Sequence, residues 1–210
     1  MNRVVIATTN PGKLREIRRI LGHLPAAILS LRDFPPVAEP DETGVTFEEN
    51  ARLKALYYDA AVASAAAPAH GGPLCTVAED SGLVIDALGG APGVQSARFL
   101  GPDASYPERF EEIFRRLAAY PGAPRTARFV CALALVQGGS VIFETTGVVE
   151  GDIAAAPRGE RGFGYDPIMY FPPYGRTLAE ATDEEKERVG HRGQAFRRLA
   201  QWLEGRPVIS

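Results

Sequence analysis

The stretch ARFVCALALVQGGSVIFETTGVV, residues 127–149, decides the fold of this chain. Two long runs of apolar and β-branched residues, 127–137 and 140–149, flank the dipeptide Gly138–Gly139. A two-residue glycine link between such runs is typical of a tight β-turn. The stretch therefore predicts a long antiparallel hairpin.

Strands and helices alternate in the part of the chain before this hairpin. The apolar run at residues 3–8 predicts a buried strand, and residues 12–21 repeat apolar side chains at helical spacing. Residues 27–31 predict a second strand. The runs 74–78 and 83–85 predict two short strands on either side of a turn at the acidic pair Glu79–Asp80.

Three further helices are predicted from capping patterns. In each pattern a Ser or Thr is followed three residues later by a Glu, and the two side chains bond each other's backbone N–H groups. The pairs are Thr46 with Glu49, Ser105 with Glu108, and Thr182 with Glu185. The first helix should run to about residue 66, before a Gly- and Pro-rich connector at 68–73, and the last should be interrupted near Gly190 and Gly193.

Together these elements predict an α/β fold with a mixed central sheet, helices packed on the sheet, and two lobes around a cleft. The 210 residues are enough for a single domain, residues 1–210, with its own core.

The composition limits the function. Hydrophobic residues at 45% and charged residues at 23% are ordinary for a soluble protein. The net charge of -3 provides no broad cationic surface, so no nucleic-acid partner is expected. No apolar run is long enough for a signal peptide or a membrane span, which predicts a cytoplasmic protein without membrane contact. Cys75 and Cys131 are too isolated for a zinc site and are interpreted as buried thiols.

Lysine is rare in this chain. The 23 basic residues comprise 20 arginines and the three lysines Lys13, Lys54 and Lys186. Lysine is a compact point charge, whereas arginine is a planar fork, so the three lysines are candidate site residues. The alternative is chance survival on solvated helix faces.

The first candidate cluster is the segment Thr8-Thr9-Asn10-Pro11-Gly12-Lys13, between the first predicted strand and helix. Backbone N–H groups and the dipole at a helix start attract an anion, and Lys13 adds a full positive charge. The segment predicts a phosphate-binding loop, although a capped turn with an exposed lysine fits equally well.

The second cluster is acidic. Glu42 precedes the helix that carries Lys54, and Glu79–Asp80 follow a predicted buried strand. Carboxylates of this kind can bind Mg²⁺ and activate a water molecule. The alternative is a turn with solvated acids.

The third cluster surrounds an aromatic loop. Phe163, Gly164, Tyr165 and Asp166 lie in the sequence GFGYDP, in which an aromatic side chain between two glycines leaves room for a stacked planar ligand. Lys186, His191 and Arg192 can donate hydrogen bonds to carbonyl or phosphate oxygens. An aromatic plug over the core and a basic helix end are the respective alternatives.

The order of these motifs resembles the inosine triphosphate pyrophosphatase family, also described as XTP/dITP diphosphatases. The resemblance covers nearly the whole chain and rests on ATTNPGK at 7–13, ETGVTFEENARLK at 42–54, EDSGLVIDALGGAPGVQSARF at 79–99, GFGYDPI at 162–168 and EEKERVGHRGQA at 184–195.

The resemblance implies a Mg²⁺-dependent enzyme that hydrolyses deaminated purine nucleoside triphosphates such as ITP, dITP and XTP to the monophosphate and pyrophosphate. It implies a homodimer, metal ligands at Glu42 and Asp80, and a general base at Asp80. The implied substrate contacts are the loop Thr8–Lys13, Lys54, Ser81, the segment Phe163–Asp166, Lys186, His191 and Arg192.

Two residues depart from the family pattern, which often has Gly at Thr9 and Ser at Gly190. The loss of a hydroxyl at Gly190 affects the predicted hydrogen bonds to the base. Two other functions stay open: a module that senses nucleotides without hydrolysis, and a related hydrolase of modified pyrimidine nucleotides.

Overall fold

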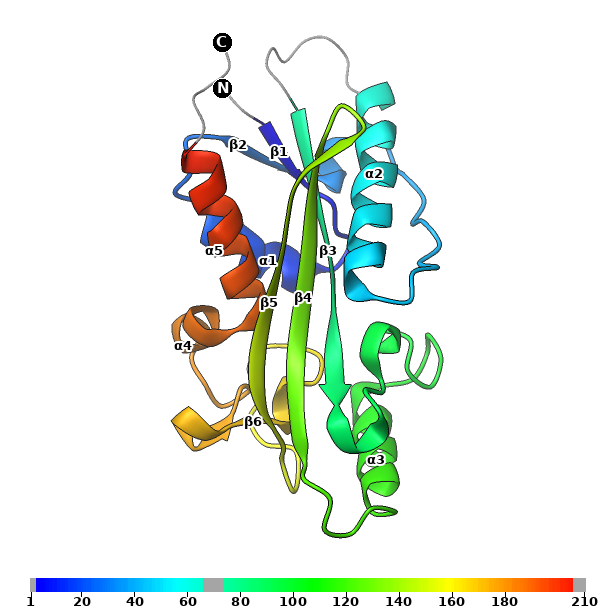
Figure 1. Cartoon of the computed structure of the whole chain (residues 1–210). Coiled ribbons are helices and arrows are strands. Elements are labelled where there is room, and N and C mark those ends of the chain that lie inside the picture. The colour runs from blue at the N-terminus through cyan, green and yellow to red at the C-terminus, as the bar shows by residue number, and fades with distance from the viewer. Residues whose placement is uncertain (1–2, 66–73, 206–210) are drawn as a thin grey trace. The chain divides into compact units, whose positions relative to one another are not determined.

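A computed structural model describes residues 3–65 and 74–205 (Figure 1). Within these residues a single mixed sheet has the strand order β2-β1-β3-β4-β5-β6-β7. Strand β1 pairs in parallel with β2 and β3, whereas β6 pairs antiparallel with β5 and β7. The strands are β1 (Arg3–Ile6), β2 (Ala27–Ser30), β3 (Leu74–Ile85), β4 (Thr126–Gln137), β5 (Ser140–Ile153), β6 (Met169–Phe171) and β7 (Arg176–Thr177). The predicted mixed α/β fold is confirmed.

The helices begin where the capping patterns predict. Hydrogen bonds in both directions join Thr46 with Glu49, and the Ser105 and Thr182 boxes are also complete. The helices are α1 (Pro11–Leu21), α2 (Phe47–Ala65), α3 (Tyr106–Leu117), α4 (Asp183–Val189) and α5 (His191–Glu204). The predicted interruption near Gly190 is confirmed, because α4 ends at Val189 and α5 begins at His191, but the one at Gly193 is wrong, because Gly193 lies within α5. The predicted end of α2 at residue 66 and the connector at 68–73 lie outside the described residues.

The hairpin of β4 and β5 forms as predicted. Gly138 and Gly139 both have positive φ, +56° and +74°, which is the backbone conformation of a type I′ turn. Other residues adopt two consecutive positive φ angles only at a cost, so the glycine pair fixes the register of the two longest strands.

The prediction of two short strands around a turn at Glu79–Asp80 is wrong. Residues 74–85 form one continuous strand, β3, which lies between β1 and β4 in the sheet. β1 pairs with residues 74–77 of β3, and β4 is the neighbour of β3 on the other side. Backbone pairing with β4 satisfies polar groups beyond residue 77, and this outweighs the turn tendency of the sequence Asp-Ser-Gly. Consecutive side chains of a strand point to opposite faces, so Glu79 and Asp80 face opposite sides of the sheet.

The described residues form two compact units, each with its own core. The first comprises residues 3–65, 74–80, 131–147 and 192–205, and the second comprises residues 81–130 and 148–191. In the first unit α1 and α5 pack on one face of the strands, and α2 lies on the other side (Figure 1). Its core is built from Val4, Ile6, Ile17, Leu21, Val77, Leu133, Leu135, Phe196 and Leu199. The second core includes Leu83, Ile85, Phe110, Ile113, Phe129, Ile168, Met169 and Leu178.

Among the described residues, every helix is too short or too polar to cross a lipid bilayer.

Asp59 of α2 supports the hairpin, and its removal should cost stability. The side chain is buried, and its Oδ2 accepts a hydrogen bond from the Gly139 N–H at 2.9 Å. We expect Asp59→Ala to lower the free energy of unfolding by about 1 to 3 kcal/mol, because that bond is lost. Urea unfolding measures the change. Asp59→Asn keeps an acceptor and should lose less; an equal loss in both variants would contradict this role.

Candidate functional site

The predicted phosphate-binding loop joins β1 to α1. Asn10 is the N-cap of α1, and its Oδ1 accepts hydrogen bonds from the N–H groups of Gly12 (2.9 Å) and Lys13 (3.1 Å). Two of the helix-start amides predicted to bind phosphate are therefore already bonded to Asn10. Thr9 donates its hydroxyl to Glu39 at 2.6 Å, a contact that glycine at this position would not make. The positive charge of this loop is carried by Lys13.

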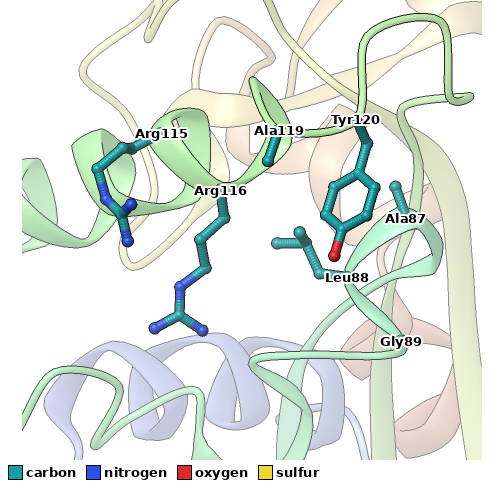
Figure 2. Close-up of a pocket in the computed structure, with 7 residues that line it drawn as sticks. All are labelled: Ala87, Leu88, Gly89, Arg115, Arg116, Ala119 and Tyr120. Atoms are coloured by element: carbon teal, nitrogen blue, oxygen red, sulfur yellow. The ribbon is translucent and has the colours of Figure 1, made fainter.

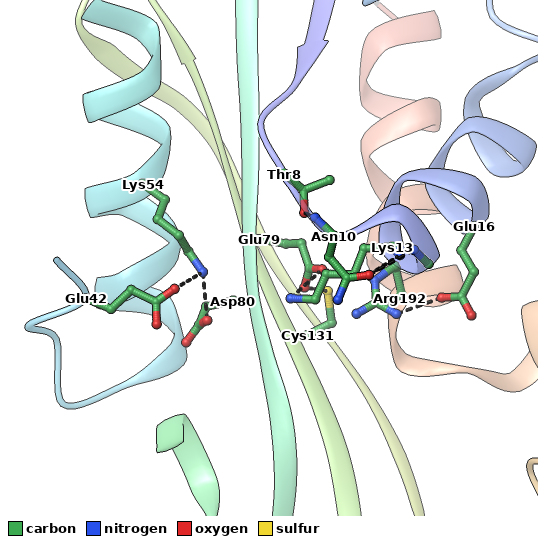
Figure 3. Close-up of polar contacts among 11 residues, drawn as sticks. Thr8, Asn10, Lys13, Glu16, Glu42, Lys54, Glu79, Asp80, Cys131 and Arg192 are labelled. Atoms are coloured by element: carbon green, nitrogen blue, oxygen red, sulfur yellow. Dashed lines mark hydrogen bonds and ion pairs between the residues drawn. The ribbon is translucent and has the colours of Figure 1, made fainter. Parts of the chain in front are cut away.

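Asp80 lies beside Lys54 and Glu42. The Lys54 ammonium is 2.8 Å from Asp80 Oδ1 and 2.9 Å from Glu42 Oε1, so all three groups meet at one point beside α2 (Figure 3). Burial raises the pKa of Asp80 above its ordinary value, and the charge of Lys54 only partly offsets this effect. Burial lowers the pKa of Lys54, but Asp80 and Glu42 outweigh it and raise that pKa overall. The predicted grouping of these three residues is thus found in the structure.

Glu79 lies on the opposite side of β3 with a different set of partners. Its Oε1 is 3.0 Å from Lys13 Nζ and 3.1 Å from Arg192 Nε, and Arg192 also binds Glu16 at 2.7 Å (Figure 3). The Cys131 thiol donates to Glu79 Oε2 at 3.3 Å. Burial on its own would raise the pKa of Glu79, but the charges of Arg192, Lys13 and Lys54 hold it well below its usual range.

The two lysines predicted to act together therefore have separate carboxylate partners. Lys13 pairs with Glu79 and Lys54 with Asp80, on the two sides of one strand (Figure 3). Lys13 still acts on Asp80 through its charge, which offsets a small part of the rise that burial causes in the pKa of Asp80. No functional role was predicted for Glu16, Cys131 or Asn50, and Glu79 was considered only as a neighbour of Asp80. The signal for Glu79 was available in the two-residue spacing with which Cys75, Val77 and Glu79 follow one face of β3.

The second unit holds the aromatic loop and Lys186. Asp166 Oδ2 lies 2.5 Å from Lys186 Nζ and accepts the Phe163 N–H at 2.9 Å. The Lys186 ammonium lies 4.7 Å from the centre of the Phe163 ring, within cation–π range. Gly162 has φ +74°, and a Cβ there would lie 2.2 Å from Asp166 Oδ2, so only glycine permits this turn. Lys186 therefore lies at the aromatic loop, where it contacts both Asp166 and Phe163.

Tyr165 of the same loop points into the core of the second unit. It is buried, donates its hydroxyl to the Ser96 carbonyl at 2.9 Å, and packs edge-on against Tyr106 at 5.2 Å. Tyr106 also lies against Gly164: a Cβ at position 164 would be 3.6 Å from the Tyr106 hydroxyl oxygen. Tyr165 therefore anchors the loop in the core. Phe163, by contrast, is a half-buried aromatic residue of the same loop.

The three predicted donors around Gly190 have different partners. Lys186 pairs with Asp166, the His191 ring lies 5.0 Å from that of Phe129, and Arg192 pairs with Glu79 and Glu16. Ser81 follows Asp80 in β3 and is half-buried.

One cavity of the second unit contains none of the predicted site residues. It has a volume of about 450 Å³ and lies between α3 and the residues that follow β3 (Figure 2). Its two cations, Arg115 and Arg116, both pair with Glu112, and these bonds lower the pKa of Glu112 to about 2. Glu112 therefore offsets part of the positive charge of these two arginines.

The chain is similar to known proteins in sequence and in fold. Residues 4–202 match the model of the Ham1 family. The chain belongs to the Ham1 family. It is 44% identical to the dITP/XTP pyrophosphatase of Geobacillus kaustophilus over 97% of this chain and 96% of that protein, and 47% identical to the one of Gloeobacter violaceus over 95% and 93%. The solved Ham1 protein of Coxiella burnetii is 38% identical, with a TM-score of 0.87, over 98% of this chain and all of that chain. The resemblance predicted from the five motifs is confirmed.

The Glu79 network should stabilise this Ham1 protein in a pH-dependent way. The folded-state pKa of Glu79 lies below the ordinary 4.5, so its contribution is complete above that pH and is lost as pH falls through the folded-state value. We expect Glu79→Gln to lower the free energy of unfolding by about 3 to 5 kcal/mol at neutral pH, because the buried Arg192 and the half-buried Lys13 lose the carboxylate that they share. The difference from the wild type should shrink as the solution is acidified. Urea unfolding at a series of pH values measures it.

Glu16→Gln is the matched control, because Glu16 is half-buried and also forms an ion pair with Arg192. Its effect should be smaller than that of Glu79→Gln. A Glu79→Gln difference that is constant with pH would contradict the charge-based explanation.

A side chain at position 190 should destabilise the turn between α4 and α5. The Gly190 N–H donates to the Lys186 carbonyl at 2.7 Å, and a Cβ at Gly190 would lie 2.6 Å from that oxygen. We expect Gly190→Ser and Gly190→Ala to lower the melting temperature through about 1 to 3 kcal/mol of steric strain. Thermal unfolding measures both. If the serine variant is as stable as the wild type while the alanine variant is not, the serine hydroxyl forms a stabilising hydrogen bond. Steric strain would then not explain why glycine occupies position 190.

Proposed function

We propose that this chain hydrolyses deaminated purine nucleoside triphosphates, such as ITP, dITP and XTP, to the nucleoside monophosphate and pyrophosphate. The observation that carries the proposal is the meeting of Asp80, Glu42 and Lys54 at one point. Hydrolysis of a triphosphate needs positive charge on the polyphosphate and a base for the attacking water, and this group supplies both. The dITP/XTP pyrophosphatases that the chain resembles over nearly its whole length support the same reaction.

The proposed triphosphate contacts other than Ser81 lie in the first unit. Lys13 and Lys54 each carry an ammonium group with three donors, to which phosphate oxygens can bind. The loop Thr8–Lys13 contributes hydroxyl, amide and backbone groups, and Ser81 adds a hydroxyl next to Asp80. These groups neutralise the triphosphate and hold its α-phosphorus for in-line attack.

We propose that Asp80 accepts the proton of the attacking water. Its pKa is raised by burial, which makes it a stronger base than an exposed aspartate, and its contact with Lys54 keeps it ionised before the reaction. Glu79 is less suited to this role, because Arg192 and Lys13 hold its pKa low.

Glu42 and Asp80 are the proposed ligands of a divalent cation, for which Mg²⁺ is our choice. The residues fit such an ion: both carboxylates contact one ammonium group, so a cation in that position would have two hard oxygen donors. The described residues contain no larger group of His, Cys, Asp and Glu. Two carboxylates suit Mg²⁺, which usually completes its coordination with water and substrate phosphates. When bound, the ion would offset the negative charge of the triphosphate.

The proposed base contacts are Phe163–Asp166, Lys186, His191 and Arg192. Phe163 offers a half-buried ring for stacking, and the cationic donors suit the 6-keto oxygen of a deaminated purine. Adenine presents an amino group at that position, so a buried donor would face another donor at a cost of about 1 to 3 kcal/mol. This difference would favour the keto purines over adenine.

We also propose a cytoplasmic homodimer, as the resemblance implies; size-exclusion chromatography with light scattering tests the assembly.

A substrate panel tests the proposed reaction. With Mg²⁺ present, the protein should release pyrophosphate from ITP and XTP at least about tenfold faster than from ATP, because the adenine mismatch reduces transition-state binding. Pyrophosphate and orthophosphate are measured separately, which identifies the bond that is cleaved. Equal rates on all triphosphates would contradict the proposal, and a preference for modified pyrimidine nucleotides would replace it with a related hydrolase.

An Asp80→Asn variant separates an enzyme from a nucleotide sensor. The amide cannot accept the water proton, so kcat should fall by about 100-fold or more, while triphosphate binding, measured by calorimetry, is retained. A wild type that binds ITP without turnover would identify a sensor.

A further inference from the structure

Asn50 is a buried polar residue of α2 to which the proposed reaction assigns no role. Its side chain is almost fully enclosed, with 1% of the residue exposed. The Nδ2 group donates to Asp80 Oδ2 at 3.3 Å, and Oδ1 accepts the Gly44 N–H at 2.8 Å. The two partners fix the orientation of the carboxamide, because a carboxylate can only accept and a backbone N–H can only donate.

The contact with Gly44 connects Asn50 to the segment that carries Glu42. Gly44 lies two residues after Glu42 and directly against the start of α2, where a Cβ would lie 2.6 Å from Asn50 Oδ1 and 2.8 Å from the Glu49 Cβ. Glycine therefore lets this segment approach α2 closely enough for the hydrogen bond to form. Asn50 thus holds the segment of Glu42 and the side chain of Asp80 at the same time.

Asn50 and Lys54 bind the two oxygens of Asp80 from one face of α2. Residues four apart on a helix are neighbours, and here Asn50 contacts Oδ2 while Lys54 contacts Oδ1. A carboxylate held through both oxygens has a fixed plane, whereas one held through a single oxygen can rotate. Lys54 provides the charge, and Asn50 provides the second point of attachment.

Building on the proposed function, we propose that Asn50 is a positioning residue that sets the plane of the Asp80 carboxylate and holds Glu42 in register with it. Asn50 does not contact the substrate in this role. It acts through Asp80 and Glu42, so its loss should weaken both the cation response and turnover, and should leave nucleotide binding through Lys13 nearly unchanged.

The test compares two Asn50 variants with a matched control on the same helix. Asn50→Ala removes both hydrogen bonds. Asn50→Asp keeps the shape and the acceptor for Gly44 but replaces the donor that faces Asp80. Asp59→Ala is the control, because Asp59 is also a buried polar residue of α2 that accepts one backbone N–H, and it lies outside the proposed site. The readouts are the melting temperature as a function of Mg²⁺ concentration, and kcat and KM for ITP.

Residues that orient metal ligands typically contribute 10- to 100-fold to metal affinity or activity, so we expect Asn50→Ala to need about tenfold more Mg²⁺ for half of its thermal stabilisation. We expect kcat of both Asn50 variants to fall by about 10- to 100-fold, with KM changed by less than about threefold. Asp59→Ala should lose melting temperature but keep the Mg²⁺ dependence and the kcat of the wild type.

The inference is overturned if the Asn50 variants keep the Mg²⁺ dependence and kcat of the wild type, or if Asp59→Ala reproduces their losses. A wild type whose melting temperature does not respond to Mg²⁺ also overturns it. If Asn50→Ala does not fold, Asn50→Asp decides by the same criteria. Absence of pyrophosphate release by the wild type contradicts the proposed function alone, since the Mg²⁺ titration of the melting temperature still tests Asn50.

Discussion

The two-residue alternation of β3 is the constraint on which the candidate site depends. Because residues 74–85 form one unbroken strand, the adjacent carboxylates Glu79 and Asp80 must point to opposite faces of the sheet. Each face carries its own helices, and these helices supply different cations: Lys54 from α2 on one side, and Lys13 and Arg192 from α1 and α5 on the other. A turn at this position would have placed both carboxylates together, where they would repel each other.

The separation gives the two acids opposite electrostatic character. Burial opposes the ionisation of both, but Glu79 meets two cations at close range and its pKa is lowered, whereas the pKa of Asp80 is raised. A carboxylate with a low pKa is a stable counter-ion that holds its partners in place. A carboxylate with a raised pKa can take up a proton more readily. Neighbouring residues of the same chemical type are therefore suited to different tasks, structural for Glu79 and chemical for Asp80.

Much of the fold could be predicted because it depends on local signals. The Gly138–Gly139 pair and the capping boxes act within a few residues, and each gave the correct element. The path of β3 could not be predicted locally, because the sequence Asp80-Ser81-Gly82 favours a turn and lies beyond the residues that pair with β1, so its extended form depends on the neighbouring strand β4. The short strands β6 and β7 were missed for the same reason, since β6 depends on pairing with β5 and β7 depends on pairing with β6.

The same distinction between local and long-range signals applies to the candidate site. The scarcity of lysine pointed to Lys13, Lys54 and Lys186 without any knowledge of the fold, and the structure pairs each with a buried or half-buried carboxylate. The sequence could not identify these carboxylates. Glu79, the partner of Lys13, lies 66 positions further along the chain, and the pairing depends on which face of β3 the Glu79 side chain occupies.

The pairing of all three lysines has a consequence for how an anion would bind. An ammonium group held by a carboxylate is already oriented and partly desolvated, so a phosphate oxygen that joins the pair meets a cation in a fixed position. The carboxylate also prevents the cation from being buried without a counter-charge while no ligand is present. Arginine in the same place would form a planar two-point contact with the carboxylate and would have less freedom to turn toward a second anion. This difference gives a physical reason for lysine at these three positions in a chain that otherwise favours arginine.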